Sequence, residues 1–404
     1  MKMLFLCSTE FQLLTALNIR YHMHPDDDAD IIVNNYHGEE KELADRIRKT
    51  GLFHHVFSVR SYREEKTLHR YFRCIIDDDE PGISFLDAVV NSLKFIKTKL
   101  MTALFGAKQY INNMVDDSSQ LRMEEYEALF AYGSKKIACH VLDYILKHNL
   151  NCRINLIDEG TAAYCVPELG RFSMPSVMEI IDTCYLYDPE VVIYKVKLCK
   201  VPSLKKDDRE FIAVLNYIFQ FDSCDIEDYR NAAIFFDQNV FQKMPKYLQK
   251  KSRLLQLIFH NSHKRHLKEE REFFKQIDVM NFVLNITKSA NSWVKLHPRS
   301  SKDIVEELHK KNIRIIRRYD LPWELIALNC PVGNNLLITN DSSSVCLYNA
   351  ALEYVGATTQ CELLCCLVGI GVLQIEDKTY FDKLCSQYNN FHIPESIEDL
   401  IVVQ

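Results

Sequence analysis

Short apolar segments alternate with helix-like segments along the chain, and this alternation constrains the fold more than any other feature. Residues 2–7 form the first apolar run, and Thr9 to Gln12 match the T-x-x-Q pattern that caps the start of a helix. Further strands are predicted at 31–33, 56–59, 129–132 and 153–157, with a helix at 135–148. Strands that alternate with helices predict a parallel sheet with helices on both faces.

The alternation restarts after a polar, acidic stretch at 221–230, so a domain boundary is expected there. Beyond it, strands are predicted at 232–236, 293–296, 313–316 and 336–339, and helices at 269–284, 300–311 and through 347–351. A chain of 404 residues that is 47% apolar can bury two cores. We therefore expect an α/β protein of two Rossmann-like domains, residues 1–225 and 226–404, which face a central cleft in the GT-B arrangement.

The composition argues against several classes of protein. With 49 basic and 55 acidic residues and a net charge of −6, the chain lacks the cationic field of a general nucleic-acid binder. It has 11 glycines and neither a G-x-G-x-x-G motif nor a Walker loop, which disfavours dinucleotide and P-loop sites. The 14 cysteines are scattered, and no apolar run reaches about 18 residues. We expect a cytoplasmic protein with reduced thiols and no nucleic-acid partner.

No metal site is predicted from the sequence. Acidic runs at 26–28 and 77–80 indicate solvated loops, and Cys361, Cys365 and Cys366 lie at helical spacing, which favours buried thiols. Residues 91–111 interleave lysines with apolar side chains and predict a basic amphipathic helix. This helix either rests on an anionic membrane surface or packs its apolar stripe within the domain or a dimer.

Polar residues follow two of the predicted strands, one in each half. The first group is Asp158, Glu159 and Gly160, where a carboxylate can serve as a general base, although acidic residues before glycine are also common in solvated turns. The second group is His297, Pro298 and Arg299. A histidine near a helix N-terminus can donate a hydrogen bond to a phosphate. Alternatively, His297 only forms hydrogen bonds within its own loop.

Two further groups in the second half suit a nucleotide. Ser342, Ser343 and Ser344 lie between a predicted strand and a helix, where hydroxyls and helix N–H groups bind phosphate oxygens, or where serine simply caps the helix. Glu324 follows a proline turn and can accept hydrogen bonds from ribose hydroxyls, or it can complement the dipole of the helix that it begins.

Taken in order, these groups resemble the motifs of the bacterial sialyltransferases: an acidic pair before glycine, then His-Pro, then serines. Within these enzymes the chain looks most like glycosyltransferase family 52, the lipooligosaccharide sialyltransferases. Residues 7–12, CSTEFQ, are similar to the opening of that family, which has cysteine, threonine and glutamine in like positions.

The resemblance implies an inverting enzyme that moves sialic acid from CMP-sialic acid to a galactose-terminated bacterial surface glycan, either lipooligosaccharide or capsule, without a metal or cofactor. It implies that Glu159, or alternatively Asp158, deprotonates the acceptor and that His297 acts on the CMP phosphate. The implied donor-binding residues are Thr9, Gln12, Gly160, Pro298, Arg299, Glu324, Ser342, Ser343 and Ser344. A homodimer and contact of 91–111 with the inner face of the cell membrane would suit such an enzyme.

Three alternatives stay open at the level of the sequence. Some members of that family place another aspartate after the first strand of the second domain, and Asp237, which is shifted from that position, is therefore a competing base. The donor can be another nucleotide sugar, such as a UDP-hexose. The chain can also be a catalytically inactive, glycan-binding paralogue.

Overall fold

The computed structural model forms two compact units, which we call the first unit and the second unit. The first unit comprises Met1–Pro202 and Tyr217–Gln220, and the second unit comprises Ser203–Asn216 and Phe221–Gln404. The chain enters the second unit for the last time at Phe221, and the domain boundary after residue 225 stays a prediction. The structure describes residues 1–34, 40–59, 107–108, 110–133, 136–170, 176–237, 291–298, 300, 305–306, 308–309, 313–339, 342–353, 363–366 and 378–393.

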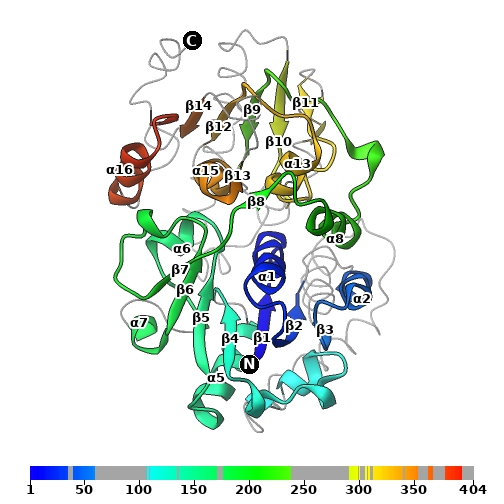
Figure 1. Ribbon diagram of the computed structural model, residues 1–404, viewed down its shortest axis with the longest axis vertical. Coiled ribbons are helices and arrows are strands. Elements are labelled where there is room, and N and C mark those ends of the chain that lie inside the picture. The colour runs from blue at the N-terminus through cyan, green and yellow to red at the C-terminus, as the bar shows by residue number, and fades with distance from the viewer. Residues whose placement is uncertain are drawn as a thin grey trace, which may run out of the picture. The chain divides into compact units, whose positions relative to one another are not determined.

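The first unit is built on a seven-stranded parallel sheet with the order β3-β2-β1-β4-β5-β6-β7 (Figure 1). The strands are β1 Lys2–Cys7, β2 Asp28–Val33, β3 Val56–Ser58, β4 Ala128–Ala131, β5 Arg153–Ile157, β6 Thr183–Leu186 and β7 Leu198–Lys200. The helices of five or more residues whose bounds the structure describes are α1 Glu10–His22, α2 Glu40–Thr50, α5 Lys136–His148, α6 Thr161–Cys165, α7 Ser176–Ile180 and α8 Arg209–Phe219, of which α8 crosses from the second unit into the first. Residues 110–114 are also helical. Short 3-10 turns lie at Ser118–Gln120, Met123–Glu125 and Pro189–Val191.

The central strands of this sheet are buried on both faces, which is why they appear in the sequence as continuous apolar runs. In β1 the side chains from Met3 to Leu6 have no exposed surface. The rings of Phe5 and Phe130, on neighbouring strands, stack with centroids 4.6 Å apart. Helix α1 begins after Thr9, whose hydroxyl accepts a hydrogen bond from the Gln12 N–H at 3.2 Å.

The second unit repeats the plan with a six-stranded parallel sheet in the order β11-β10-β9-β12-β14-β15 (Figure 1). The strands are β9 Ala233–Phe236, β10 Ser292–Lys295, β11 Arg314–Ile315, β12 Leu336–Thr339, β14 Leu363–Cys366 and β15 Phe391–His392. Two further short strands, β8 Leu204–Lys205 and β13 Leu352–Glu353, pair in parallel. The helices whose bounds the structure describes in this unit are α13 Trp323–Asn329, α14 Ser343–Cys346, α15 Tyr348–Ala351 and α16 Lys378–Gln387, and a 3-10 turn lies at Ser223–Asp225.

The α/β class and the two Rossmann-like units expected from the sequence are confirmed by these two strand orders. Two details differ. The helix expected through 347–351 is two short helices, α14 and α15, separated at Leu347. The helical spacing inferred for Cys365 and Cys366 is wrong, because both residues belong to strand β14. The helix expected at 269–284 and most of those at 91–111 and 300–311 lie outside the described residues.

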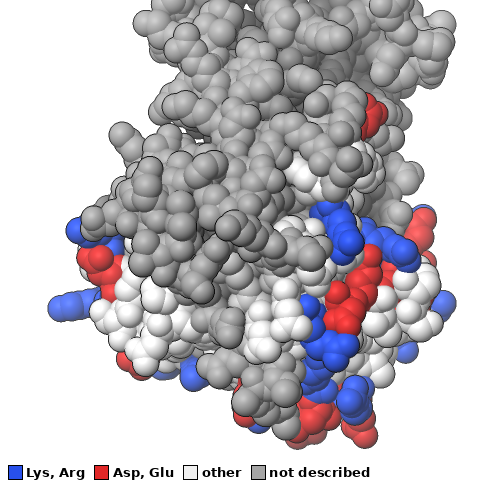
Figure 2. Space-filling view, turned by 90° about the horizontal axis from the view of Figure 1, so that it is seen from above, with Lys and Arg blue, Asp and Glu red and all other residues white. Residues whose placement is uncertain are grey.

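The surface carries charges of both signs. In the view of Figure 2, Lys and Arg side chains are interspersed with Asp and Glu side chains over the described part of that face. Within the described ranges, no helix is both long and apolar enough to cross a bilayer.

Candidate active site

Each sheet contains a topological switch point beside its first strand. Strand β1 lies between β2 and β4, and strand β9 lies between β10 and β12, so the chain leaves each first strand on one side and later returns on the other. In open parallel sheets, ligands bind outside the carboxyl ends of the strands at such a point. Among the described residues, Thr9 follows β1, Asp158 and Glu159 follow β5, His297 follows β10 and Ser342 follows β12, so these predicted site residues lie along the carboxyl edges, whereas Glu324 belongs to α13.

In the first unit, two of these residues meet. The Thr9 hydroxyl, which follows β1, donates a hydrogen bond to Glu159 Oε2 at 2.9 Å, and Glu159 follows β5. The same hydroxyl accepts from the Gln12 N–H as the N-cap of α1. Thr9 is thus held by its helix and in turn orients the Glu159 carboxylate, which is partly exposed. A donated hydrogen bond favours the charged form of a carboxylate.

Gln12 spans the switch point of the first unit. Its side chain is 2% exposed, its Oε1 accepts from the Ser8 N–H at 2.6 Å, and its Nε2 donates to the Tyr132 carbonyl at 3.4 Å. In a standard capping box the side chain would return to the N–H of the N-cap residue, here Thr9, but in this structure it reaches one residue further back. The Gln12 amide therefore links the end of β1 to the end of β4.

Asp158, the neighbour of Glu159, has a different environment. It has no exposed surface, and it accepts hydrogen bonds from the Gly160 N–H at 2.8 Å, the Tyr187 N–H at 3.1 Å and the Tyr164 hydroxyl. Burial raises the pKa of Asp158 from 3.8 to about 6, while the three donors oppose that shift. The Asp158 carboxylate is thus engaged inside the unit, whereas that of Glu159 reaches the strand edge.

Gly160 separates these two environments. Its φ of 105° and ψ of −160° lie in a region that residues with a Cβ rarely adopt. This backbone turn brings the Gly160 N–H back onto Asp158 and begins helix α6. The acidic-acidic-glycine motif therefore produces one buried and one accessible carboxylate.

A small hollow of about 20 Å³ lies at the carboxyl ends of β1 and β2. Its lining residues are Cys7, Thr9, Glu10, Leu13, Val33, Asn34 and Leu43. Thr9 belongs both to this hollow and to the pair with Glu159. Burial, with a smaller contribution from the charge of Glu159, raises the pKa of the Cys7 thiol, so this cysteine is an unreactive part of the wall. The sequence analysis missed Glu10 and Asn34, although Asn34 directly follows β2.

In the second unit, Asp237 is the first residue after β9 and is 6% exposed. It accepts a hydrogen bond from the Ser300 hydroxyl at 3.2 Å, and the Ser300 N–H donates to the His297 carbonyl at 2.9 Å. The Asp237 N–H donates to the Lys295 carbonyl at 2.9 Å. The structure therefore brings Asp237 together with the turn that carries His297 and Pro298, both partly exposed, while Arg299 lies outside the described residues.

Lys295 is a charged residue that the sequence analysis missed. It ends β10 and is 6% exposed, and its Nζ donates to the Tyr319 carbonyl at 2.7 Å and the Leu296 carbonyl at 3.3 Å. The sequence does contain an indication of this buried charge, since a lysine lies within the apolar run from Trp293 to Leu296. A buried ammonium needs such acceptors, and here they fix the strand end that precedes His297.

The serines and Glu324 also lie in the second unit. The Ser342 N–H donates to the Thr339 hydroxyl at 2.9 Å, and that hydroxyl donates to the Phe236 carbonyl at 3.1 Å, which joins the ends of β12 and β9. Ser342, Ser343 and Ser344 are partly exposed at the start of α14, which is a single turn. Glu324 is buried in the first turn of α13.

Comparison with known proteins finds no matching family model and no matching curated protein. Among solved structures, the chain is similar to an α/β-galactoside α-2,3-sialyltransferase from the luminous marine bacterium Photobacterium phosphoreum, with 10% identity, coverage of 97% of this chain and 98% of that chain, and a TM-score of 0.47. It is also similar to MurG from Acinetobacter baumannii, with 10% identity, coverage of 100% and 88%, and a TM-score of 0.37. Likenesses this distant assign no activity to the chain.

Proposed function

We propose that this chain is a GT-B glycosyltransferase, specifically an inverting sialyltransferase that uses CMP-sialic acid and a galactose-terminated surface glycan, lipooligosaccharide or capsule. The observation that carries the proposal is the hydrogen bond from Thr9 to Glu159 at the carboxyl edge of the first sheet. It joins two residues from separate motifs of the sialyltransferase resemblance, 150 positions apart, at a place where open sheets bind ligands.

In this proposal Glu159 is the general base. It takes the proton of the acceptor hydroxyl while the acceptor oxygen bonds to the anomeric carbon of sialic acid, and the bond from that carbon to the CMP phosphate breaks. Thr9 orients the carboxylate, since its hydroxyl donates to Oε2. Asp158 is assigned a positioning role, because its carboxylate is buried and already accepts three hydrogen bonds.

Negative charge grows on the departing phosphate, and the second unit is proposed to stabilise it. His297 donates to the phosphate or protonates it, and the hydroxyls of Ser343 and Ser344 bind its oxygens. Glu324 is assigned to the ribose. The remaining donor-binding predictions are Gln12, Gly160, Pro298, Arg299 and Ser342. The reaction in this form needs no metal. A homodimer and membrane contact through 91–111 also stay predictions.

The experiment that tests the proposal is a donor screen on the full chain, with galactose-terminated acceptors and CMP-sialic acid or UDP-hexoses. We expect acceptor-dependent release of CMP and thermal stabilisation by CMP rather than UDP. Turnover of a UDP-hexose alone would assign another donor. Binding of CMP-sialic acid without turnover of any acceptor would favour an inactive, glycan-binding protein.

Two pairs of variants test the residues. Glu159→Gln should lower kcat by about 10²–10⁴-fold, the usual contribution of a general base, and Glu179→Gln, an exposed glutamate on α7, is the matched control. His297→Ala should lower kcat/KM, with His309→Ala, an exposed histidine of the same unit, as its control. If Glu159→Gln and His297→Ala both kept wild-type turnover, the assignment of the site would be wrong.

A further inference from the structure

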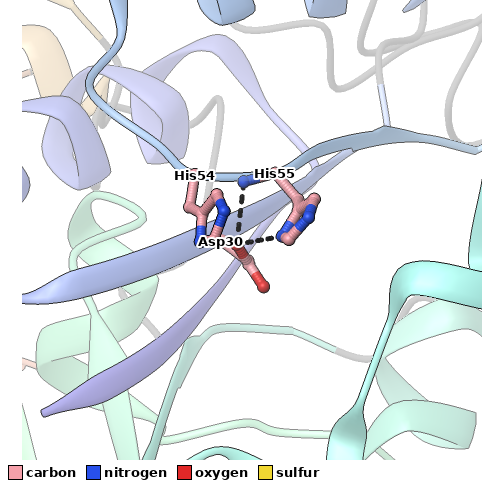
Figure 3. Close-up of side chains that lie close together, drawn as sticks. All are labelled: Asp30, His54 and His55. Atoms are coloured by element: carbon pink, nitrogen blue, oxygen red, sulfur yellow. Dashed lines mark hydrogen bonds and ion pairs between the residues drawn. The ribbon is translucent and has the colours of Figure 1, made fainter.

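A second group of chemically competent side chains lies on the first sheet, away from the carboxyl edge. Asp30 is the third residue of β2, and His54 and His55 directly precede β3 (Figure 3). Each of the three offers one ligand atom, and these atoms lie within 4.8 Å of one another. The two histidines stand at the amino end of β3, whereas the candidate base follows the carboxyl end of β5. Because the sheet is parallel, these are opposite edges.

The spacing suits a tetrahedral metal ion. Asp30 Oδ1 and His55 Nδ1 form a hydrogen bond of 3.1 Å, and an ion that binds both atoms would replace the proton between them. Two ligand atoms at about 2.0–2.1 Å from one tetrahedral Zn²⁺ are separated by about 3.3 Å, so this pair needs almost no movement to share an ion. The rings of His54 and His55 stack with centroids 4.2 Å apart and an interplanar angle of 22°, so one ring must turn before both can bind the same ion. His54, whose side chain is 65% exposed, is free of close packing that would prevent this turn.

Hydrogen bonds to neighbouring groups orient two of the proposed ligands, His54 and Asp30. Asp28 Oδ1 lies 3.2 Å from His54 Nδ1, so in the tautomer that donates from Nδ1, the Nε2 of His54 carries a lone pair for a metal. Asp30 Oδ2 accepts from the Tyr126 hydroxyl at 2.6 Å, and its Oδ1 accepts from the His55 N–H at 2.8 Å. Since a carboxylate oxygen has two lone pairs, Oδ1 can keep that backbone bond and still bind an ion.

The local charge and the access from solvent also favour a metal ion at this cluster. Asp30 is 1% exposed, but the side chain of His54 is 65% exposed, so an ion can enter from solvent. Two carboxylates, Asp28 and Asp30, with two neutral imidazoles balance the charge of a divalent cation. Imidazole and carboxylate are ligands that Zn²⁺ takes readily.

A competing cluster, formed by Asp222, Cys224 and Asp225, is less suited to a metal. Asp222 and Asp225 cap each other's backbone in a 3-10 turn, and Asp225 forms an ion pair with Arg318 at 2.8 Å. An ion at this cluster would have to compete with the Arg318 cation for Asp225, whereas the partners of Asp30 are a hydroxyl, a backbone N–H and an imidazole.

We propose that Asp30, His54 and His55 bind one divalent transition-metal ion, Zn²⁺ in the first instance, with a fourth position for water. The ion ties β2 to the entry of β3, which is the edge strand of the sheet. The site lies on the edge opposite the candidate base and does not depend on the proposed transferase activity. Its expected effect is therefore on the stability of the first unit.

The test is calorimetric titration of Zn²⁺ into the full chain after treatment with a chelator. We expect one ion per wild-type chain, and affinity at least about 10-fold weaker in His54→Ala and in His55→Ala. Because His54 is mostly exposed, its variant should fold normally, which circular dichroism without metal checks. The controls Cys224→Ser and His309→Ala should bind Zn²⁺ like the wild type.

Co²⁺ supplies a second readout that does not depend on affinity. Visible bands of a tetrahedral ion without a thiolate-to-metal charge-transfer band support a site made of nitrogen and oxygen ligands. A thiolate band, loss of binding in Cys224→Ser, or wild-type Zn²⁺ affinity in both histidine variants would overturn the proposal.

Discussion

Asp158 gives the chain a dependence of stability on pH that is opposite to that of most carboxylates. Its pKa is raised from 3.8 to about 6, mainly by burial, so the folded state holds the proton more tightly than the unfolded state. The free energy of unfolding that this group contributes is therefore highest below pH 3.8 and falls as the pH rises to about 6. At 1.36 kcal/mol per pH unit, (6 − 3.8) × 1.36 gives a loss of about 3 kcal/mol.

Asp158→Asn removes this titration. The substitution also costs about 1–3 kcal/mol, because an amide cannot accept from all three donors, but that cost does not change with pH. The free energy of unfolding of the wild type minus that of Asp158→Asn should therefore fall by about 2 kcal/mol between pH 4 and pH 7, which is most but not all of the full change, because the unfolded carboxyl is already more than half deprotonated at pH 4. Taking the difference cancels the titration of other groups, and Asp207→Asn, at the surface, controls for the loss of a carboxylate.

Urea unfolding at several pH values between 4 and 7 measures this difference. Circular dichroism is the appropriate signal, because both tryptophans of the chain, Trp293 and Trp323, belong to the second unit. A difference that stays flat, or that rises with pH, would show that Asp158 is not a buried carboxylate with a raised pKa.

Three further substitutions probe the same unit, each measured by urea unfolding. Gly160→Ala should cost about 1–3 kcal/mol, because its φ of 105° strains any residue with a Cβ, and a cost below 0.5 kcal/mol would contradict the turn. Thr9→Val should cost about 1 kcal/mol through loss of the N-cap and should also lower kcat through Glu159, whereas Thr9→Ser should do neither. Tyr126→Phe removes the donor to Asp30 and should cost about 1–3 kcal/mol; unchanged stability would argue against that hydrogen bond.

The sequence predicted most of the strands that are buried on both faces, although it missed β6 (TCYL). Strand β1 (KMLFLC) and strand β12 (LLIT) are such runs, and a parallel sheet explains both. The strands that it missed are short and lie toward the sheet edges, as in β7 (LCK), where two of three residues are exposed. In β14 (LLCC) the cysteine spacing suggested a helix, because a run of four apolar residues carries no period of its own.

The candidate site could be predicted only in part, for a related reason. Strand ends are visible in the sequence, so Glu159 and His297 could be selected from it. What each side chain touches depends on distant segments, and nothing in the sequence pairs Thr9 with Glu159. The cluster of Asp30 with the two histidines before β3 was missed because an aspartate inside an apolar strand has no local signature of its partners.

Each of the two candidate bases, Glu159 and Asp237, accepts a hydrogen bond from a hydroxyl, but their surroundings differ. A hydroxyl donates to each carboxylate, from Thr9 to Glu159 and from Ser300 to Asp237. Asp237 is buried and is bonded to the turn that carries His297, so in the proposed reaction its negative charge would lie on the side where phosphate charge develops. A base at that place would carry its charge toward the departing phosphate, whereas a carboxylate that is hydrogen-bonded to Ser300 can orient the turn. We infer that Asp237 positions His297, and that the acceptor proton goes to Glu159.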